Sequence, residues 1–246
     1  MTAALLEVDG LTKRFGGVTA VDDCSFSVPE GTVTALVGPN GSGKTTVFNL
    51  VTGYLRPDTG GVRFAGNAVR RPDPANLSRR GLTRTFQQAR IFAYLTLVQN
   101  MVAAVQQPWH ALLPIRRSVR SGETARALEL LEEFGLARLA HHRAGTLSYG
   151  QKKLLEFAAV LMGEPRLVLL DEPTAGVNPV LCEQIEARVR ELNSRGLTFL
   201  LVEHNMNLVM RLCDPVVVLD HGTKLAEGAP ADVRNDPRVL DAYLGG

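Results

Sequence analysis

The sequence predicts an α/β protein with a mostly parallel sheet, a small antiparallel β subdomain near the N-terminus and an inserted helical subdomain. Two observations lead to this prediction. Three nearly all-apolar runs, "LVLL" from residue 167, "TFLLV" from residue 198 and "VVVL" from residue 216, alternate with helix-like segments, and such runs are typical of parallel strands buried on both faces. The stretch from about 88 to 165 is mainly helical in pattern and lies between strands of the sheet.

The N-terminal elements read as strands. "LLEVDGLTKRF" and "DDCSFSVPEG" predict two strands around a turn, and "TVTALVG" and "GVRFAG" predict two more, because glycines and prolines punctuate these short β-branched segments. An antiparallel β piece is therefore expected at this end of the chain.

Helices are marked by their ends. Thr96 and Gln99 have capping-box spacing at the start of "LTLVQNM", Gly135 ends "ETARALELLEEFG", and Gly163 with Pro165 ends "QKKLLEFAAVLMG". The segments "LCEQIEARVRELNSRG" and "NMNLVMRL" are helical connections between the later apolar runs.

Three further segments are less informative. The tail "EGAPADVRNDPRVLDAYLGG" is expected to form one short amphipathic helix on the core, with Tyr243 and Leu244 filling a groove. "RRPDPANLSRRG" and "QQPWHALLPIRRSVR" are the least regular parts. Their arginines are interpreted as solvated faces, with a phosphate or lipid site as the alternative.

Composition narrows the class of protein. The 246 residues are 45% hydrophobic and 21% charged, as in ordinary globular proteins, and the net charge of +2 does not favour a nucleic-acid binder. We expect no secretion signal in "MTAALLEVDG" and no membrane-spanning run. Three cysteines without CxxC spacing indicate isolated thiols in a reducing compartment. These features predict a cytosolic domain.

The stretch "GPNGSGKTT" fits the phosphate-loop pattern G-x-x-x-x-G-K-[ST] between a strand and a helix. Glycines let successive backbone N–H groups point at phosphate oxygens, and the helix N-terminus adds positive potential. Lys44 is predicted to reach the β- and γ-phosphates of ATP, and the Thr45 hydroxyl to bind Mg²⁺. A chance glycine-rich turn is the alternative. The predicted ATP-binding residues of the loop are Gly38, Pro39, Asn40, Gly41, Ser42, Gly43, Lys44, Thr45 and Thr46.

Two carboxylates follow the apolar run "LVLL". Asp171 is predicted to hold Mg²⁺ through a coordinated water, and Glu172 to orient or deprotonate the attacking water. Neighbouring side chains of a strand point in opposite directions, so the two roles are compatible only where the strand ends and the chain turns. The alternative is that the pair caps the next turn.

Taken together, the motifs resemble those of the ATP-binding subunits of ABC transporters along almost the whole chain. "GPNGSGKTT" resembles Walker A, "TFQQ" the Q-loop, "LSYGQ" the signature, "LVLLDEP" Walker B, "AGVNP" the D-loop and "VEHNM" the switch histidine. The resemblance implies a P-loop NTPase core and a single ABC ATP-binding domain over residues 1–246. Within it, about 88–165 would be the helical insertion and about 223–246 a tail on the core. It also implies a head-to-tail dimer around two ATP molecules.

The same resemblance implies roles for single residues. Gln87 would contact Mg²⁺ and the attacking water, and His204 would contact the γ-phosphate. Phe15 would stack on adenine, with Val21 beside the base. The alternatives are a surface glutamine, a structural histidine and a core role for Phe15.

In the signature, Ser148, Tyr149, Gly150 and Gln151 would face the γ-phosphate bound by the opposite protomer, at the start of a helix. Tyr149 stands where the usual LSGGQ has its first glycine. A tyrosine would be costly there if the position needed positive φ, so Gly150 is expected to be the essential glycine.

Several stretches resemble the ATPases of branched-chain amino acid importers, among them "LSYGQ" and the tail, and the related urea and short-chain amide importers remain an alternative. The expected partners are a second ABC ATPase or a second copy of this chain, membrane permease subunits docking at the Q-loop groove and, indirectly, a solute-binding protein. Nucleic acid is not expected. The location implied is the cytoplasmic face of the plasma membrane. A soluble non-transport ABC ATPase and a nucleotide sensor without turnover are the rival functions.

Overall fold

The computed structural model describes residues 3–70, 73–85, 91–105 and 121–244, leaving the side chains of Ser121 and Leu244 outside the description. Within these ranges no helix is both long and apolar enough to cross a membrane. The strands are β1 Ala4–Phe15, β2 Val18–Pro29, β3 Val33–Val37, β4 Thr59–Phe64, β5 Asn67–Ala68, β6 Leu82–Arg84, β7 Leu167–Asp171, β8 Thr198–Val202, β9 Val216–Asp220 and β10 Thr223–Gly228. The helices are α1 Lys44–Val51, α2 Pro74–Arg79, α3 Leu97–Val105, α4 Ser121–Glu133, α5 Tyr149–Leu161, α6 Pro179–Ser194, α7 Met206–Leu212, α8 Pro230–Arg234 and α9 Pro237–Leu244.

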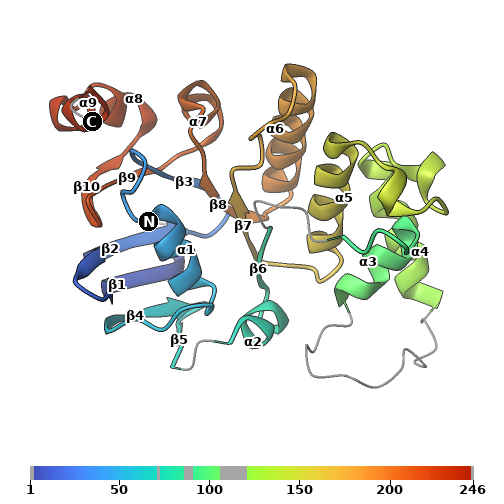
Figure 1. The fold of residues 1–246 in the computed structure, drawn as a ribbon, viewed down its shortest axis with the longest axis horizontal. Coiled ribbons are helices and arrows are strands. Elements are labelled where there is room, and N and C mark those ends of the chain that lie inside the picture. The colour runs from blue at the N-terminus through green and yellow to red at the C-terminus, as the bar shows by residue number, and fades with distance from the viewer. Residues whose placement is uncertain (1–2, 71–72, 86–90, 106–120, 245–246) are drawn as a thin grey trace.

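Two sheets form the frame of the molecule (Figure 1). The larger has the strand order β10-β9-β3-β8-β7-β6, in which the five strands from β9 to β6 run parallel and β10 is antiparallel to β9. The smaller has the order β2-β1-β4-β5 and is antiparallel throughout. This confirms the predicted α/β class with its mostly parallel sheet and N-terminal antiparallel piece.

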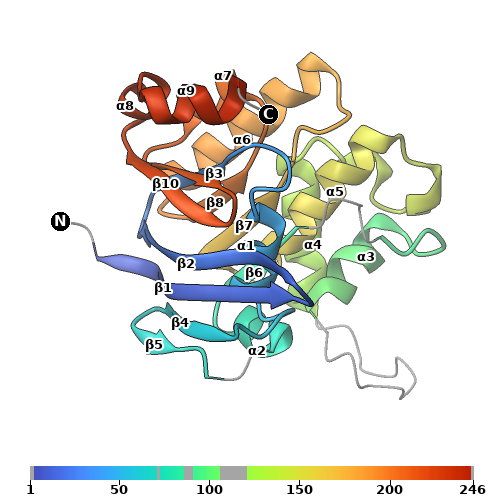
Figure 2. The same cartoon turned by 60° about the vertical axis from the view of Figure 1, so that its left-hand side comes forward.

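The central strands are buried on both faces, as their unbroken apolar runs predict. In β7, Val168 and Leu170 contribute to a core shared with α3 to α9, whereas Leu167 and Leu169 contribute to a core shared with α1 and the antiparallel sheet. Alternate residues thus pack against different layers. Figure 2 shows the antiparallel strands crossing one side of the molecule, with the later helices beyond the central sheet.

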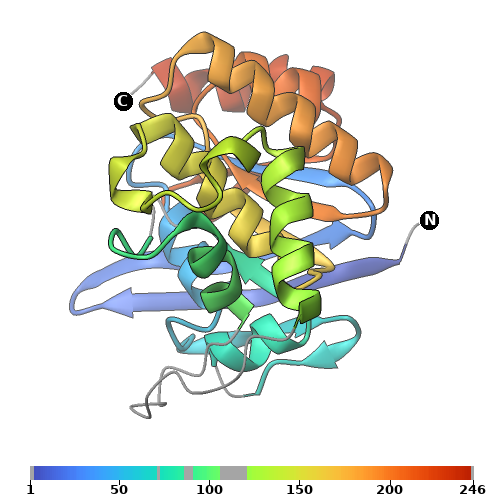
Figure 3. The same cartoon turned by 90° about the vertical axis from the view of Figure 1, so that its right-hand side faces the viewer.

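The helices α3, α4 and α5 lie together at one side of the molecule, as Figure 3 shows in green to yellow. They fall within the stretch predicted to be a helical insertion, and Thr96 and Gln99 form the expected capping box, with backbone-to-side-chain bonds of 2.8 and 3.2 Å. The boundaries of that subdomain, 88 and 165, remain a prediction. The irregular stretch "QQPWHALLPIRRSVR" lies outside the described residues.

One stretch is more regular than its sequence indicates, and one expectation was wrong. The stretch "RRPDPANLSRRG" contains helix α2, which starts at Pro74 because the Asp73 side chain accepts a hydrogen bond from the N–H of Ala75. The tail forms strand β10 and two helices rather than one helix. The tail helix is interrupted because Pro237 cannot continue α8, and Asp236 instead accepts a hydrogen bond from the N–H of Arg238.

Candidate functional site

The phosphate loop runs from the end of β3 to the start of α1, as its sequence predicts. Gly41 and Gly43 have φ values of 81° and 98°, a region that other residues rarely adopt. A Cβ on Gly43 would lie 2.5 Å from the carbonyl oxygen of Ala20, and one on Gly38 would collide with the carbonyl oxygen of Leu219. The glycines are therefore required both by backbone conformation and by the close approach of neighbouring strands.

Lys44 is folded into this loop and is only 6% exposed. Its Nζ donates hydrogen bonds of 2.8 Å to the carbonyl oxygens of Gly38 and Pro39. Burial lowers the pKa of Lys44 below its ordinary value, and the negative charge of Glu172 partly opposes that shift. Thr45 is exposed on the first turn of α1, where its hydroxyl is accessible to a ligand.

Asp171 is the last residue of β7 and is 5% exposed. Its Oδ2 accepts a 2.6 Å hydrogen bond from Nη2 of Arg84, which lies on the neighbouring parallel strand β6. The other end of that guanidinium, Nη1, donates to Oδ1 of Asn49 on α1 at 2.6 Å. Sequence analysis did not identify Arg84, because its partners are remote in the chain and "LTR" was not recognised as a strand.

Glu172 follows at the point where β7 ends, and its φ of +48° turns the chain. The chain turns here as expected for two adjacent carboxylates with different roles. Oε1 of Glu172 lies 2.9 Å from Nε2 of His204, which follows strand β8. The parallel pairing of β7 with β8 places the carboxyl ends of both strands side by side, so residues 32 positions apart meet.

The residue before the histidine was also missed. Glu203 is a buried carboxylate, 4% exposed, that accepts hydrogen bonds from Thr174 and from the backbone N–H groups of His204 and Asn205. A charged residue directly after a nearly all-apolar strand was the available signal.

The signature segment caps helix α5. Oγ of Ser148 accepts a 3.3 Å bond from the N–H of Gln151, and Oε1 of Gln151 accepts a 3.0 Å bond from the N–H of Ser148. Tyr149 is the first helical residue and does not have positive φ, so it is not strained. A Cβ on Gly150 would lie 2.5 Å from Cδ2 of Leu181 in α6, which gives a packing reason for glycine there.

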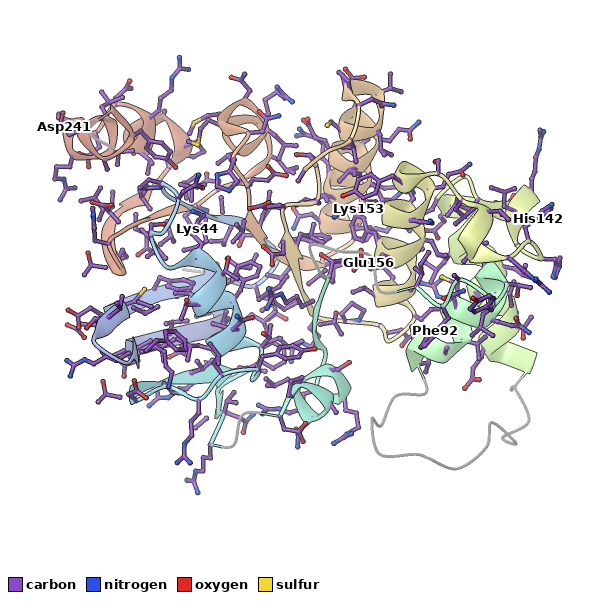
Figure 4. The ribbon with its side chains drawn as sticks, in the orientation of Figure 1. Lys44, Phe92, His142, Lys153, Glu156 and Asp241 are labelled. Atoms are coloured by element: carbon purple, nitrogen blue, oxygen red, sulfur yellow. The ribbon has the colours of Figure 1, made fainter. Side chains whose placement is uncertain are left out.

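Tyr149 also contacts the segment after Walker B. Its hydroxyl donates to the carbonyl oxygen of Ala175 at 3.4 Å, and the Lys153 Nζ lies 5.9 Å from the ring centroid. Figure 4 shows Lys153 on α5 and Lys44 at the start of α1, in different parts of the molecule. The helix that the signature caps, α5, and the helix that follows the phosphate loop, α1, therefore lie apart within one chain (Figure 1).

The remaining predicted residues fall in different surroundings. Phe15 ends β1 and is 47% exposed, with Nζ of Lys13 at 5.7 Å from the ring centroid, so the core alternative for Phe15 is wrong. Val21 is fully buried beside Gly43 and is not available to a base, which corrects that expectation. Gln87 lies outside the described residues.

The tail also reaches the phosphate loop. Tyr243 of α9 is 40% exposed; burial raises the pKa of its hydroxyl, and a hydrogen bond from the backbone of Gly38 opposes that shift. Val233 and Val239 of the two tail helices are buried in the core that covers the parallel sheet.

A groove of about 770 Å³ lies between helix α2, strand β6, helix α3 and helix α5. Apolar side chains that line it include Ile91, Phe92, Val105 and Val160, and Phe92 is 54% exposed. Arg84 and Ile91, on either side of the Q-loop segment in the sequence, both line this groove.

Comparison with known proteins places this architecture in a family. Residues 21–175 match the family model described as ABC transporter, and residues 223–246 match the one described as branched-chain amino acid ATP-binding cassette transporter. The high-affinity branched-chain amino acid transport ATP-binding protein BraF of Pseudomonas aeruginosa is 41% identical over 100% of this chain and 99% of its own. The corresponding LivG of Escherichia coli K12 is 38% identical with the same coverage.

Solved structures agree with the sequence comparisons. The ADP conformation of MJ1267, an ATP-binding cassette of an ABC transporter, has a TM-score of 0.90, 35% identity and full coverage of both chains. The dimeric post-hydrolysis state of the cassette MJ0796, bound to ADP and Pi, has a TM-score of 0.77 and 25% identity over 92% of this chain and 98% of that one. The chain therefore belongs to the ABC transporter ATPases, nucleotide-binding enzymes that hydrolyse ATP, in the group that includes the branched-chain amino acid transport ATP-binding proteins.

Proposed function

We propose that this chain is the ATP-hydrolysing subunit of an importer for branched-chain amino acids. The observation that carries the proposal is the convergence of the phosphate loop, Asp171, Glu172 and His204 at the carboxyl ends of three neighbouring strands, β3, β8 and β7. Ligands of open parallel sheets bind at that edge. The cargo assignment is supported by the relatives' names and by the matched tail at residues 223–246.

In the proposed reaction, the oxygen of a water molecule bonds to the γ-phosphorus of ATP while the bond from that phosphorus to the β–γ bridging oxygen breaks, so that ADP leaves and phosphate forms. Glu172 accepts a proton from that water, and His204, 2.9 Å from its carboxylate, contacts the γ-phosphate and keeps the carboxylate oriented. Lys44 exchanges its carbonyl partners in the loop for phosphate oxygens, so its ammonium neutralises charge on the β- and γ-phosphates. Phe15, exposed at the end of β1, stacks on the adenine.

Magnesium fits the oxygen donors at this edge. Asp171 offers a carboxylate at a strand end, and Thr45 offers an exposed hydroxyl on the first turn of α1. Mg²⁺ prefers one or two such protein oxygens together with phosphate and water, and it would neutralise phosphate charge. Asp171, Thr45 and Gln87 are the residues proposed to hold it.

The separation of α5, which carries the signature, from α1, which follows the phosphate loop, supports a dimer. We infer that Ser148, Tyr149, Gly150 and Gln151 cover the γ-phosphate bound by a second cassette, either a copy of this chain or a sister ATPase. The dimeric state of MJ0796 with ADP and Pi supports this arrangement.

The membrane partner is proposed to dock in the groove between α2, β6, α3 and α5. Exposed apolar side chains such as Phe92 suit a short amphipathic element of a permease subunit. The related CbiO1 of Clostridium perfringens, 28% identical with a TM-score of 0.81, is described as part of the ABC transporter complex CbiONQ. The chain would then act at the cytoplasmic face of the membrane, with a solute-binding protein contacting the permeases rather than this subunit.

The test replaces Glu172 by glutamine, which keeps the size but cannot accept the proton. ATP hydrolysis should fall by about 10²–10⁴-fold, while ATP binding persists and an ATP-bound dimer accumulates on size-exclusion chromatography. Lys44→Ala should instead weaken nucleotide binding. In cells with the complete transporter, Glu172→Gln should abolish uptake of labelled leucine. Unchanged hydrolysis by Glu172→Gln would refute the mechanism, and loss of urea uptake with normal leucine uptake would refute the cargo.

A further inference from the structure

Glu203 occupies a buried position between the two segments that carry the reacting pair. Its Oε1 accepts hydrogen bonds from the N–H of Thr174 at 3.0 Å and from the hydroxyl of Thr174 at 2.5 Å. Its Oε2 accepts bonds from the N–H of His204 at 3.0 Å and the N–H of Asn205 at 3.3 Å. Each oxygen of this carboxylate therefore serves a different part of the chain.

These two parts are the turns that follow β7 and β8. Thr174 lies two residues after Glu172, and His204 directly follows Glu203. The φ of +48° at Glu172 is one that a non-glycine residue keeps only when its surroundings hold it. Two hydrogen bonds hold this turn. The N–H of Glu172 donates to the carbonyl oxygen of Val202 at 2.9 Å, and, two residues further along the chain, the N–H of Thr174 donates to the carboxylate of Glu203.

The start of α7 depends on the same group. Asn205 donates its N–H to Glu203, and its own side chain caps α7 by accepting a bond from the N–H of Leu208 at 3.2 Å. Hydrogen bonds to a buried carboxylate are stronger and shorter than neutral ones. One planar group thus fixes the turn after β7, the turn after β8 and the beginning of α7 relative to one another.

We propose that Glu203 is a positioning residue for ATP hydrolysis, whose carboxylate sets the separation of the turns after β7 and β8 and thereby keeps Glu172 within hydrogen-bond reach of His204. Glu203 is only 4% exposed, and both of its oxygens accept hydrogen bonds from the two turns, so it acts through the residues that it positions. The inference rests on the proposed roles of Glu172 and His204, and it gives a role to the residue that directly precedes the switch histidine.

The decisive variant is Glu203→Gln. Glutamine has the same size but only one acceptor oxygen, so one of the two turns faces an NH₂ group instead of an acceptor. Misplacement of a reacting group by about 1 Å can cost about 10²-fold in rate, so kcat is expected to fall about 10- to 100-fold, with the KM for ATP changed less than about twofold. If Glu203 had only a structural role, Glu203→Gln would lower the stability of the protein without lowering kcat much more than it changes KM.

Glu186→Gln is the matched control. Glu186 also joins two elements, since it accepts hydrogen bonds from Arg190 of its own helix α6 and from Arg211 of α7, the latter at 2.7 Å. It does not contact the turns after β7 and β8 in the part of the chain that the structure describes. This control should lose stability but keep kcat.

A second pair of variants covers the case in which Glu203→Gln does not fold. Thr174→Val removes the hydroxyl that donates to Glu203, and Thr174→Ser keeps it. Thr174→Val should lower kcat, and Thr174→Ser should keep most of the kcat that Thr174→Val loses. The double variant Thr174→Val with Glu203→Gln should have nearly the same kcat as Glu203→Gln alone, because both substitutions remove the same contact.

Each result separates this inference from the proposed function. If Glu172→Gln has no effect on the rate of ATP hydrolysis, the proposed function is refuted. If Glu172→Gln stops hydrolysis while Glu203→Gln loses no more kcat than Glu186→Gln, the positioning role alone is overturned. It is equally overturned if Thr174→Val and Thr174→Ser have equal kcat, or if the loss in Glu203→Gln lies in KM.

Discussion

Replacing Arg84 by methionine tests the energetics of the Walker B aspartate. Nη2 of Arg84 and Oδ2 of Asp171 are 2.6 Å apart, and the two side chains are only 8% and 7% exposed. Methionine has an unbranched apolar side chain but no charge. The substitution therefore leaves the Asp171 carboxylate buried without its cation, and it also removes the bond from Nη1 to Asn49.

Removing one member of a buried ion pair costs about 3–5 kcal/mol, because the remaining charge cannot recover its hydration. Both side chains are almost fully buried, so no discount for solvent screening applies to this pair. For a domain of this size each kcal/mol shifts the unfolding midpoint by roughly 2–4 °C, so Arg84→Met should lower it by roughly 6–20 °C.

The assay is thermal and chemical denaturation, with Arg166→Met as the matched control. Arg166 pairs with Glu30 at the same 2.6 Å, but those side chains are 50% and 46% exposed, and loss of such a pair costs at most about 1 kcal/mol. Adding Asp171→Asn to Arg84→Met should recover part of the stability, because the uncompensated charge is gone. Equal losses in Arg84→Met and Arg166→Met would refute the reasoning.

Two further predictions concern packing and thiol chemistry. Gly150→Ala should lower the free energy of unfolding by up to about 2 kcal/mol, because displacing Leu181 costs about 1–3 kcal/mol and alanine returns about 1 kcal/mol of helix propensity. Gly122→Ala in α4 should be neutral or stabilising, because no atom of the described residues, beyond its chain neighbours and its own helix backbone, lies within 4 Å of a Cβ added there; equal effects of the two substitutions in denaturant titrations would contradict this. Burial raises the pKa of Cys24 to about 11 and of Cys213 to about 12, so little reactive thiolate is present at pH 8. Both cysteines should therefore resist thiol reagents at pH 8 until the protein unfolds, and rapid labelling of the native protein would contradict the burial of these thiols.

Much of the fold was predictable because the signals are local. The capping boxes at Thr96–Gln99 and Ser148–Gln151 join residues three apart, so their hydrogen bonds are visible in the sequence before any tertiary contact forms. Helix α2 was missed because it has only six residues, too few to show a helical periodicity. The break in the tail was signalled by Pro237 but was outweighed by the amphipathic pattern on both sides.

The site was predicted in part. Residues that act through the backbone, such as the glycines of the phosphate loop, sit in one contiguous motif, whereas Arg84 and Glu203 act on partners 87 and 29 positions away. Such pairings depend on which strands are neighbours, and a sequence pattern does not state that order. The burial of Val21 was missed for the same reason, because it depends on contact with a distant loop.

The sequence by itself determined the α/β class, the phosphate loop and the carboxylates after β7, because these depend on burial pattern, glycine conformation and residues adjacent in the chain. Only the tertiary structure decided that β8 lies between β3 and β7, that Glu172 therefore meets His204 at 2.9 Å, and that Glu203 joins their two turns. The physical reason is that hydrogen bonds between strands and buried charge pairs are set by distance in space, and the parallel register supplies that distance after the chain has folded.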